Sequence, residues 1–137
     1  MILYHFTSPE HLPKILEAGY LKVTESNLSR TRTHAGPDVV WLTRNPEAAA
    51  NNWWQVSGRR SVDKVGIRFT VDVPKREAVR WWEWARRRGI DPGWARTLAE
   101  VGGSGSWYVI ERTVPAAEWT GIINARTAEP IALEGAR

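Results

Sequence analysis

The chain has 137 residues, of which 42% are hydrophobic, with nine tryptophans and no cysteine. This length fits one domain, and the apolar content is sufficient for one hydrophobic core. The lack of cysteine excludes a disulfide framework and a thiolate metal site. No two of the three histidines have the spacing of zinc ligands. We therefore expect no metal site, one domain over residues 1–126, and a loosely held tail over 127–137.

The net charge is +4, which mildly favours an anionic partner. The positive charge is concentrated in Arg59–Arg88, here called the basic segment. Such a run indicates either a nucleic-acid interface or simply a solvated face. The N-terminus has no basic region before an apolar stretch, and no apolar run approaches about 18 residues. This pattern predicts a soluble, cytoplasmic protein without membrane contact, and it indicates no particular oligomeric state.

The first twenty residues predict a strand over 2–6 and a helix over 9–18. Ser8 is a good N-cap, Pro9 suits the first helical position, and Gly19 fits just past the last turn. His5 and Thr7 share one strand face. A strand end backed by a helix is a common way to hold polar side chains in a fixed position.

The remainder of the chain predicts strands and helices mixed along one domain, which is an α+β fold. Proline follows four expected strand ends and pushes each preceding residue into extended geometry. Further strands are expected at 39–43, 65–73, 107–113 and 120–124, and further helices at 46–55, 75–88 and 92–100. The long polar connection 22–38 has the length of a functional or mobile loop, and it contains Ser26, Asn27 and His34.

The expected helix 75–88 carries three of the tryptophans. Trp81 and Trp82 lie on an apolar stripe with alanines at helical spacing, so we expect both in the core. Trp84 falls off this stripe, beside arginines. It either packs under a neighbouring loop, which is the simpler interpretation, or serves as a stacking platform.

The run Tyr-His-Phe-Thr, the helix with Leu-Pro-x-Ile-Leu and the Gly-Tyr-Leu exit resemble the N-terminus of ADP-ribosyltransferase-fold proteins. The DNA-targeting ADP-ribosyltransferase toxins are the most similar group, and the RNA 2′-phosphotransferases are more distant. The run from Val39 to Pro46 resembles the second strand of the toxins. The resemblance implies a split β-sheet and NAD as a substrate. It also implies a first-strand histidine on the ribose, an aromatic wall for nicotinamide and a glutamate from a later strand.

The resemblance makes His5 and Glu111 candidate catalytic residues. Without the resemblance, a lone histidine on a short apolar strand such as His5 is more simply an ordinary core residue. Glu111 either approaches the same cleft as His5 or pairs with an arginine at the strand end. If Val114–Pro115 is aligned with the strand exit of the toxins, their glutamate falls at Trp107 instead.

The candidate cofactor-binding residues each have a structural alternative. Trp41 is either a nicotinamide wall or a core aromatic. Arg68 either meets a pyrophosphate or is solvated. The others could equally share a ligand contact, end a strand or cap a turn; they are Thr7, Ser26, Asn27, His34 and Thr43.

These observations predict an NAD-dependent ADP-ribosyltransferase, a toxin or phage-borne effector that modifies nucleic acid or protein. The alternatives are a non-catalytic nucleotide or nucleic-acid binding module on the same fold, and a structural protein without cleft chemistry. If the cleft exists, we expect the His5 and Trp41 side chains to open into it together, beside loop 22–38.

Overall fold

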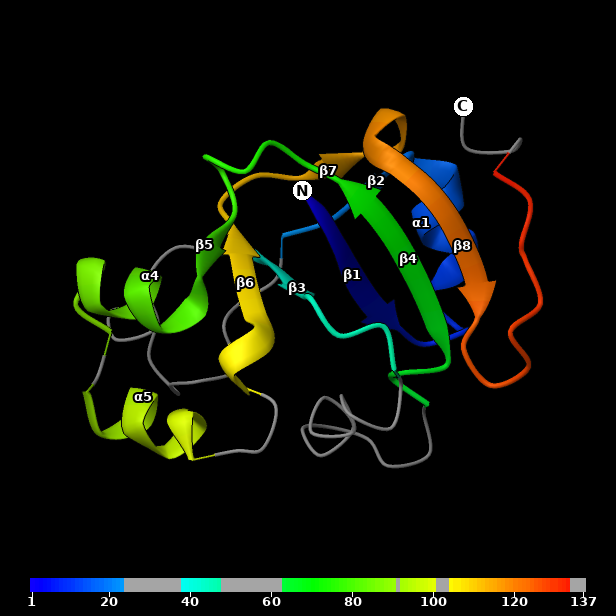
Figure 1. The fold of residues 1–137 in the computed structure, drawn as a ribbon. Helices are drawn as coiled ribbons and strands as arrows, with labels where there is room; N and C mark the ends of the chain where they lie inside the picture. Colours follow the sequence, from blue (N-terminus) through cyan, green and yellow to red (C-terminus); the bar gives the residue numbers. More distant parts are fainter. Residues whose placement is uncertain (24–37, 48–62, 91, 101–103, 134–137) are drawn as a thin grey trace.

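The computed structural model describes residues 1–23, 38–47, 63–90, 92–100 and 104–133. Its main element is an antiparallel sheet of six strands in the order β5-β6-β3-β1-β4-β8 (Figure 1). These strands are β1 Ile2–Thr7, β3 Val40–Thr43, β4 Ile67–Asp72, β5 Val79–Arg80, β6 Trp107–Ile110 and β8 Trp119–Asn124. A second, two-stranded sheet pairs β2, Tyr20–Leu21, with β7, Val114–Pro115.

Helices lie on both sides of the main sheet. They are α1 Leu12–Ala18, α4 Trp81–Arg87 and α5 Pro92–Ala99, with short 3-10 turns at η2 Ser104–Ser106 and η3 Ala116–Glu118. This mixture of helices with an antiparallel sheet is an α+β fold, as the sequence predicts. Each of the five strands expected from sequence is present, with shifted ends.

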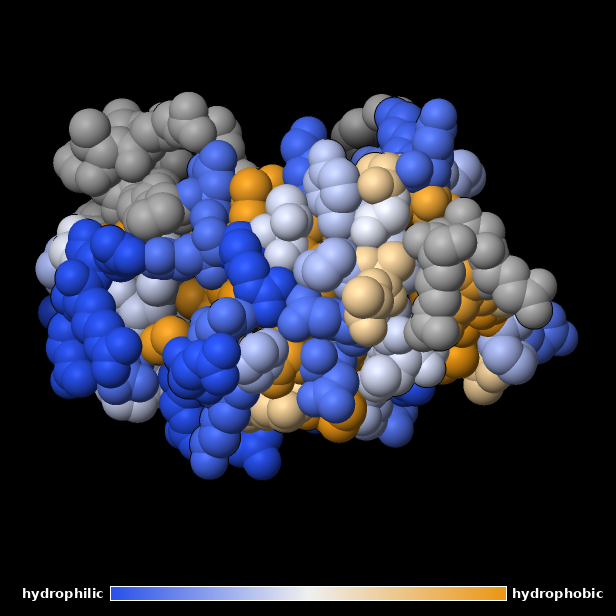
Figure 2. Space-filling view, turned by 90° about the horizontal axis from the view of Figure 1, so that it is seen from above, coloured by the Kyte–Doolittle hydropathy of each residue, from blue (hydrophilic) through white to orange (hydrophobic). Residues whose placement is uncertain are grey.

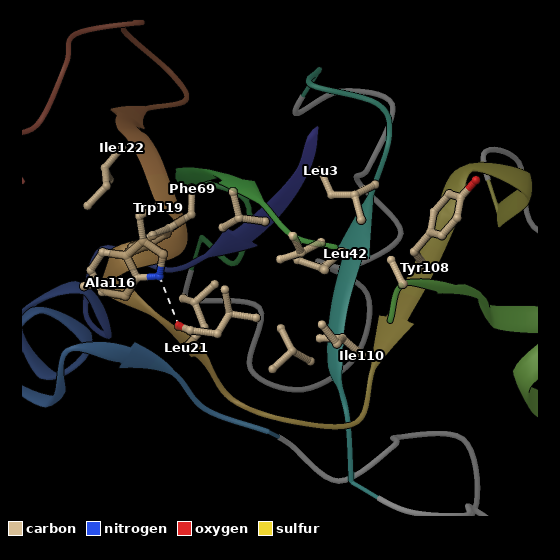
Figure 3. Close-up of a cluster of buried hydrophobic side chains, with 14 of the residues drawn as sticks. Leu3, Leu21, Leu42, Phe69, Tyr108, Ile110, Ala116, Trp119 and Ile122 are labelled. Atoms are coloured by element: carbon tan, nitrogen blue, oxygen red, sulfur yellow. Dashed lines mark hydrogen bonds between the residues drawn. The ribbon is translucent and has the colours of Figure 1, made fainter. Parts of the chain in front are cut away.

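The main sheet has two faces, each with its own hydrophobic cluster. On the α1 face, Leu3, Leu42 and Phe69 pack with Trp119 beneath α1 and the small sheet (Figure 3). On the opposite face, here called the α4 face, the strands pack against helices α4 and α5. That cluster contains Val39, Trp81, Trp84, Ala85, Ile90, Trp107 and Val109.

Helix α1 ends where the sequence predicts and begins later. Gly19 has a φ of 79° and donates its N–H to the Ile15 carbonyl at 2.9 Å, as a left-handed C-cap does. The first turn is not helical, because Ser8 Oγ contacts His11 Nδ1 at 3.1 Å and the helix starts at Leu12.

The expected helix 75–88 is divided into a turn, strand β5 and helix α4. Because α4 begins at Trp81, its buried stripe consists of Trp81, Trp84 and Ala85, at spacings of three and four residues. Trp84 is therefore packed, as expected, but it lies on the buried stripe of α4 rather than off it. The core position expected for Trp82 is wrong, since its side chain is 44% exposed.

Three other expectations change at the ends of elements. Pro46 and Glu47 are not helical, and the remainder of the expected helix 46–55 lies outside the described residues. Strand β6 ends at Ile110, because the next two residues form ion pairs outside the sheet. Glu111 pairs with Arg88, and Arg112 pairs with Glu77 and Glu118. The described part of the tail, 127–133, is hydrogen-bonded rather than loose, with the Ile131 N–H on the Ile122 carbonyl at 2.8 Å.

Candidate functional site

Neighbouring strands of the main sheet carry most of the candidate site residues. Strands β1, with His5, and β3, with Trp41, are adjacent, and β6 pairs with the other edge of β3. Strand β4, with Arg68, pairs with β1 on the opposite side. The remaining candidates, Ser26, Asn27 and His34, lie outside the described residues.

His5 is bonded to the backbone of the next strand. Its Nδ1 lies 2.8 Å from the Trp41 carbonyl oxygen. Because a carbonyl only accepts, Nδ1 carries the proton, and in the neutral ring Nε2 is an acceptor. Burial lowers the pKa of His5, although the Trp41 carbonyl partly opposes this shift. The ring is therefore neutral at pH 7, with its edge against Phe69 at a centroid distance of 6.5 Å.

The His5 and Trp41 side chains lie on opposite faces of the sheet. His5 is directly opposite Phe69 on the α1 face, whereas Trp41 packs with the α4 cluster. The expectation that both side chains open into one cleft is therefore wrong. The cause is the register, in which Tyr4 rather than His5 is opposite Thr43. Thr7 shares the α1 face with His5.

Trp41 and Thr43 form part of the α4 face. The Trp41 ring is half-buried and makes edge contacts with Trp84 and Trp107, at centroid distances of 6.4 and 6.1 Å. Thr43 is fully buried, and its hydroxyl accepts the Asn45 N–H at 3.1 Å. Trp41 thus has core contacts and remains partly exposed, while Thr43 ends its strand.

Arg68 is a half-buried cation for which the described residues supply no carboxylate. Its guanidinium lies 5.0 Å from the centroid of the Tyr4 ring, and Nη1 donates to the Pro46 carbonyl at 3.0 Å. Its Nε is buried and has no hydrogen-bond partner. An uncompensated buried donor on a charged group is costly, so this side chain is suited to receive an anion.

Glu111 lies at the far end of β6 and is already bound. Arg88 Nε donates to its Oε1 at 2.8 Å, Arg88 Nη2 pairs with its Oε2, and Trp84 Nε1 donates to Oε1 at 2.7 Å. Burial by itself raises the pKa of Glu111, but the bonds from Arg88 and Trp84 outweigh it and the pKa is lowered. This is the ion-paired arrangement that the sequence offered as the alternative to a catalytic role.

The four residues of β6 that lie level with β1 include no carboxylate, and Glu111 follows the end of this strand. Trp107 is opposite Thr43, which is itself opposite Tyr4, whereas β6 residue Ile110 is opposite Val40. The Trp107 side chain is 3% exposed, and its buried indole nitrogen has no acceptor within the part of the chain that the structure describes. The structure therefore brings no carboxylate of β6 to the level of the β1 site.

Sequence reasoning did not single out Tyr4 or Arg88. Tyr4 is within the quoted strand motif, but its contact with Arg68 depends on the pairing of β1 with β4, which no sequence pattern revealed. Arg88 appeared only as one charge among many in the basic segment. Its partner Glu111 is 23 residues away in sequence.

Within the part of the chain that the structure describes, no cluster of three His, Asp or Glu side chains is arranged to hold a metal ion. No described helix is long and apolar enough to span a membrane. No protein-family model, curated protein or solved structure matches this chain.

Proposed function

We propose that this chain binds a nucleotide of the NAD class on an ADP-ribosyltransferase-like sheet, as a binding module without a working catalytic carboxylate. The observation that carries the proposal is Arg68, a half-buried cation with an unpartnered Nε and no carboxylate among the described residues. A pyrophosphate would supply the missing negative charge through charge-assisted hydrogen bonds.

The surroundings of Arg68 support a nucleotide rather than a simple anion. Tyr4 lies beneath its guanidinium, and Trp41 is on the same face and partly exposed. Aromatic rings of this kind stack on nicotinamide or adenine. His5 would act from the other face as a positioning residue, because its bond to the Trp41 carbonyl holds the backbone that carries this ring.

The position of the carboxylate favours binding over transfer. At the level of His5, strand β6 presents the buried Tyr108, since Tyr108 is opposite Leu42 and Thr43 is opposite Tyr4. Glu111 would have to leave both Arg88 and Trp84 before it could meet a ribose. A group that stabilises developing charge must be aimed at the reacting centre in advance. We therefore expect the protein to retain NAD without releasing nicotinamide.

Calorimetry and thermal unfolding with NAD, ADP-ribose and pyrophosphate test this proposal. At a concentration about 100 times Kd, the ligand should raise the free energy of unfolding by about 2.7 kcal/mol. Arg68→Gln should remove most of the effect, whereas Arg96→Gln, an exposed control, should leave it intact. Absence of binding by all three ligands, or binding unaffected by Arg68→Gln, would overturn the proposal.

A nicotinamide-release assay separates the binding module from the transferase. We expect no release by the wild-type protein. If the wild-type protein releases nicotinamide and Glu111→Gln does not, the transferase function is established instead. This variant keeps the shape of the side chain and removes its charge.

A second candidate function, nucleic-acid binding, is favoured by the outer surface around α4. Glu77, Glu83 and Glu111 are each already paired with an arginine. Exposed cations remain that have no carboxylate partner among the described residues; they are Lys75, Arg76, Arg80, Arg86 and Arg96. Figure 2 shows hydrophilic side chains over much of the left side of the molecule, where Figure 1 places helices α4 and α5.

The exposed Trp82 gives this surface a ring on which a base could stack. The Arg86 guanidinium lies 5.5 Å from its centroid. An arginine beside an open aromatic ring is typical of single-strand binding surfaces. Trp82 thus replaces Trp84, which is buried, as the candidate platform.

Salt titrations with a single-stranded oligonucleotide test this second function. Replacing Arg80 and Arg86 together by glutamine should flatten the slope of log K against log salt by about 1–2 units. Lys14→Gln is the control, because Lys14 is an exposed cation on α1, away from this surface. Binding that does not depend on salt would assign these cations to a solvated face.

A further inference from the structure

A cavity lies apart from Arg68, between strand β5, the end of β6 and the last turn of α4. Its volume is about 420 Å³, within the range of small-molecule sites. The apolar part of its lining consists of Val79, Trp84, Val109 and Ile110. Its charged part consists of Glu77, Arg87, Arg88, Glu111 and Arg112.

Most of the charges around this cavity already neutralise one another. Arg88 is bound to both oxygens of Glu111, and Arg112 is bound to Glu77 and to Glu118 outside the cavity. These bonds hold four of the five charged side chains in place and leave them little capacity for a ligand.

Arg87 is the exception among the lining residues. Among the described residues, its one partner is Glu83, one helical turn earlier, through a single contact of 3.0 Å. The Arg87 side chain is 64% exposed, and exposed pairs of this spacing contribute only about 0.3–0.5 kcal/mol. Its guanidinium can therefore turn to a ligand at little cost.

We propose that this cavity binds a small apolar carboxylic acid, with its hydrocarbon body on Val79, Trp84 and Val109 and its carboxylate on Arg87. Arg87 is the one lining cation that is available to a ligand, so the cavity suits a ligand with a single negative charge. A dianion such as a phosphate monoester would find no second available cation in the lining, because Arg88 and Arg112 are already bound to carboxylates. The apolar lining favours a phenyl-sized or indole-sized body over a sugar.

Trp84 provides a direct reporter of occupancy. Its indole N–H donates to Glu111 beside the cavity, so a ligand against the ring should shift this resonance in a ¹H–¹⁵N spectrum. Glu111→Gln changes the acceptor of this bond and thereby identifies the Trp84 signal among those of the other tryptophans.

The test titrates the full chain with 3-phenylpropionate, its neutral amide and phenyl phosphate, each to about 10 mM, where a site with a Kd near 1 mM is almost filled. We expect the acid to shift the Trp84 signal saturably and the amide to bind about 10-fold more weakly. Arg87→Gln should weaken the binding of the acid by about the same factor and leave the binding of the amide unchanged. Arg86→Gln, a neighbour that does not line the cavity, should change neither.

Three results would overturn the proposal. These are no saturable shift with the acid, equal affinity of the acid for the wild type and Arg87→Gln, and tighter binding of phenyl phosphate than of the acid. Arg87 and Arg86 are both exposed, so both variants should fold, and far-UV circular dichroism verifies this. Because Arg68 does not line this cavity, the result is independent of the proposed nucleotide site.

Discussion

At the scale of single residues, the buried indole nitrogens are not equally satisfied. Trp81 donates to the Ser104 carbonyl at 2.8 Å, and Trp119 donates to the Val114 carbonyl at 3.1 Å. Trp107 is equally buried but has no acceptor. An unsatisfied buried donor costs about 1–3 kcal/mol. The indole N–H of Trp107 therefore lowers the free energy of unfolding in a way that those of Trp81 and Trp119 do not.

This difference predicts unequal effects of the same substitution. Trp107→Phe and Trp119→Phe remove similar volumes, but only Trp119→Phe removes a hydrogen bond, the one that its indole N–H donates to the Val114 carbonyl. We expect Trp119→Phe to lower the free energy of unfolding by about 1–2 kcal/mol more than Trp107→Phe does. Urea denaturation measures both values, and an equal or larger loss for Trp107→Phe would contradict the argument.

The lowered pKa of His5 predicts a specific dependence of stability on pH. The unfolded chain takes up a proton near the ordinary histidine pKa of about 6.5, whereas folded His5 does so only at lower pH. The free energy of unfolding should therefore fall as the pH drops below about 6.5. Glu111 and Asp63, whose pKa values are also lowered, add a further loss only below about 4.5.

Urea denaturation at pH 7.5 and 5.5, compared with His5→Asn, isolates the contribution of His5. Asparagine keeps a donor for the Trp41 carbonyl but does not titrate. The stability lost between the two pH values should be smaller in this variant. An identical loss in both proteins would exclude His5 as the source.

At the scale of elements, the end of α1 depends on backbone conformation. Gly19 has a φ of 79°, where a Cβ is disfavoured, and the chain continues directly into β2. Its carbonyl accepts the Ala116 N–H at 2.8 Å, so this turn also joins α1 to η3. The capping glycine thus orients the small sheet over the α1 face.

Gly19→Ala should therefore lower the free energy of unfolding by about 1–2 kcal/mol, measured by urea denaturation. Gly105→Ala is the matched control, because a Cβ there meets no atom within 4 Å and its φ is not positive. The control should change stability by less than about 0.5 kcal/mol. Equal effects at the two glycines would show that strain at Gly19 is unimportant.

At the scale of the whole molecule, the sheet separates two hydrophobic clusters. Val71 and Phe69 belong to the cluster on the α1 face, whereas Val109 belongs to the cluster on the α4 face. Strands β4 and β6 are separated by β1 and β3, a distance of about 14 Å. In the described parts of the chain, the two clusters share no residue and are separated by the backbone of the sheet.

Double-mutant cycles test this separation. Val71→Ala and Val109→Ala should be additive within about 0.5 kcal/mol, because the two sites share no partner. Phe69→Leu and Trp119→Phe should couple by more than about 0.5 kcal/mol, because their rings contact with centroids 5.0 Å apart. Coupling of the two valines as strong as that of the rings would indicate one continuous core.

The amino-acid sequence alone determined the α+β class, the five expected strands and the Gly19 cap, since alternation, proline and glycine act locally. It also indicated a packed Trp84. It did not indicate how far helix 75–88 extended, because β5 forms only by pairing with β6. Trp82 was expected in the core because the predicted helix began at residue 75. The observed helix α4 begins six residues later, at Trp81, and it presents a different stripe to the sheet.

The arrangement of the candidate site was decided by tertiary structure. The register of β1 against β3 places His5 and Trp41 on opposite faces, and a shift of one residue would have reversed this. The contact of Arg68 with Tyr4 and the ion pair of Glu111 with Arg88 join residues 64 and 23 positions apart. Local sequence preferences carry no information about such partners, because the partners are selected only when the strands pair and the helices pack.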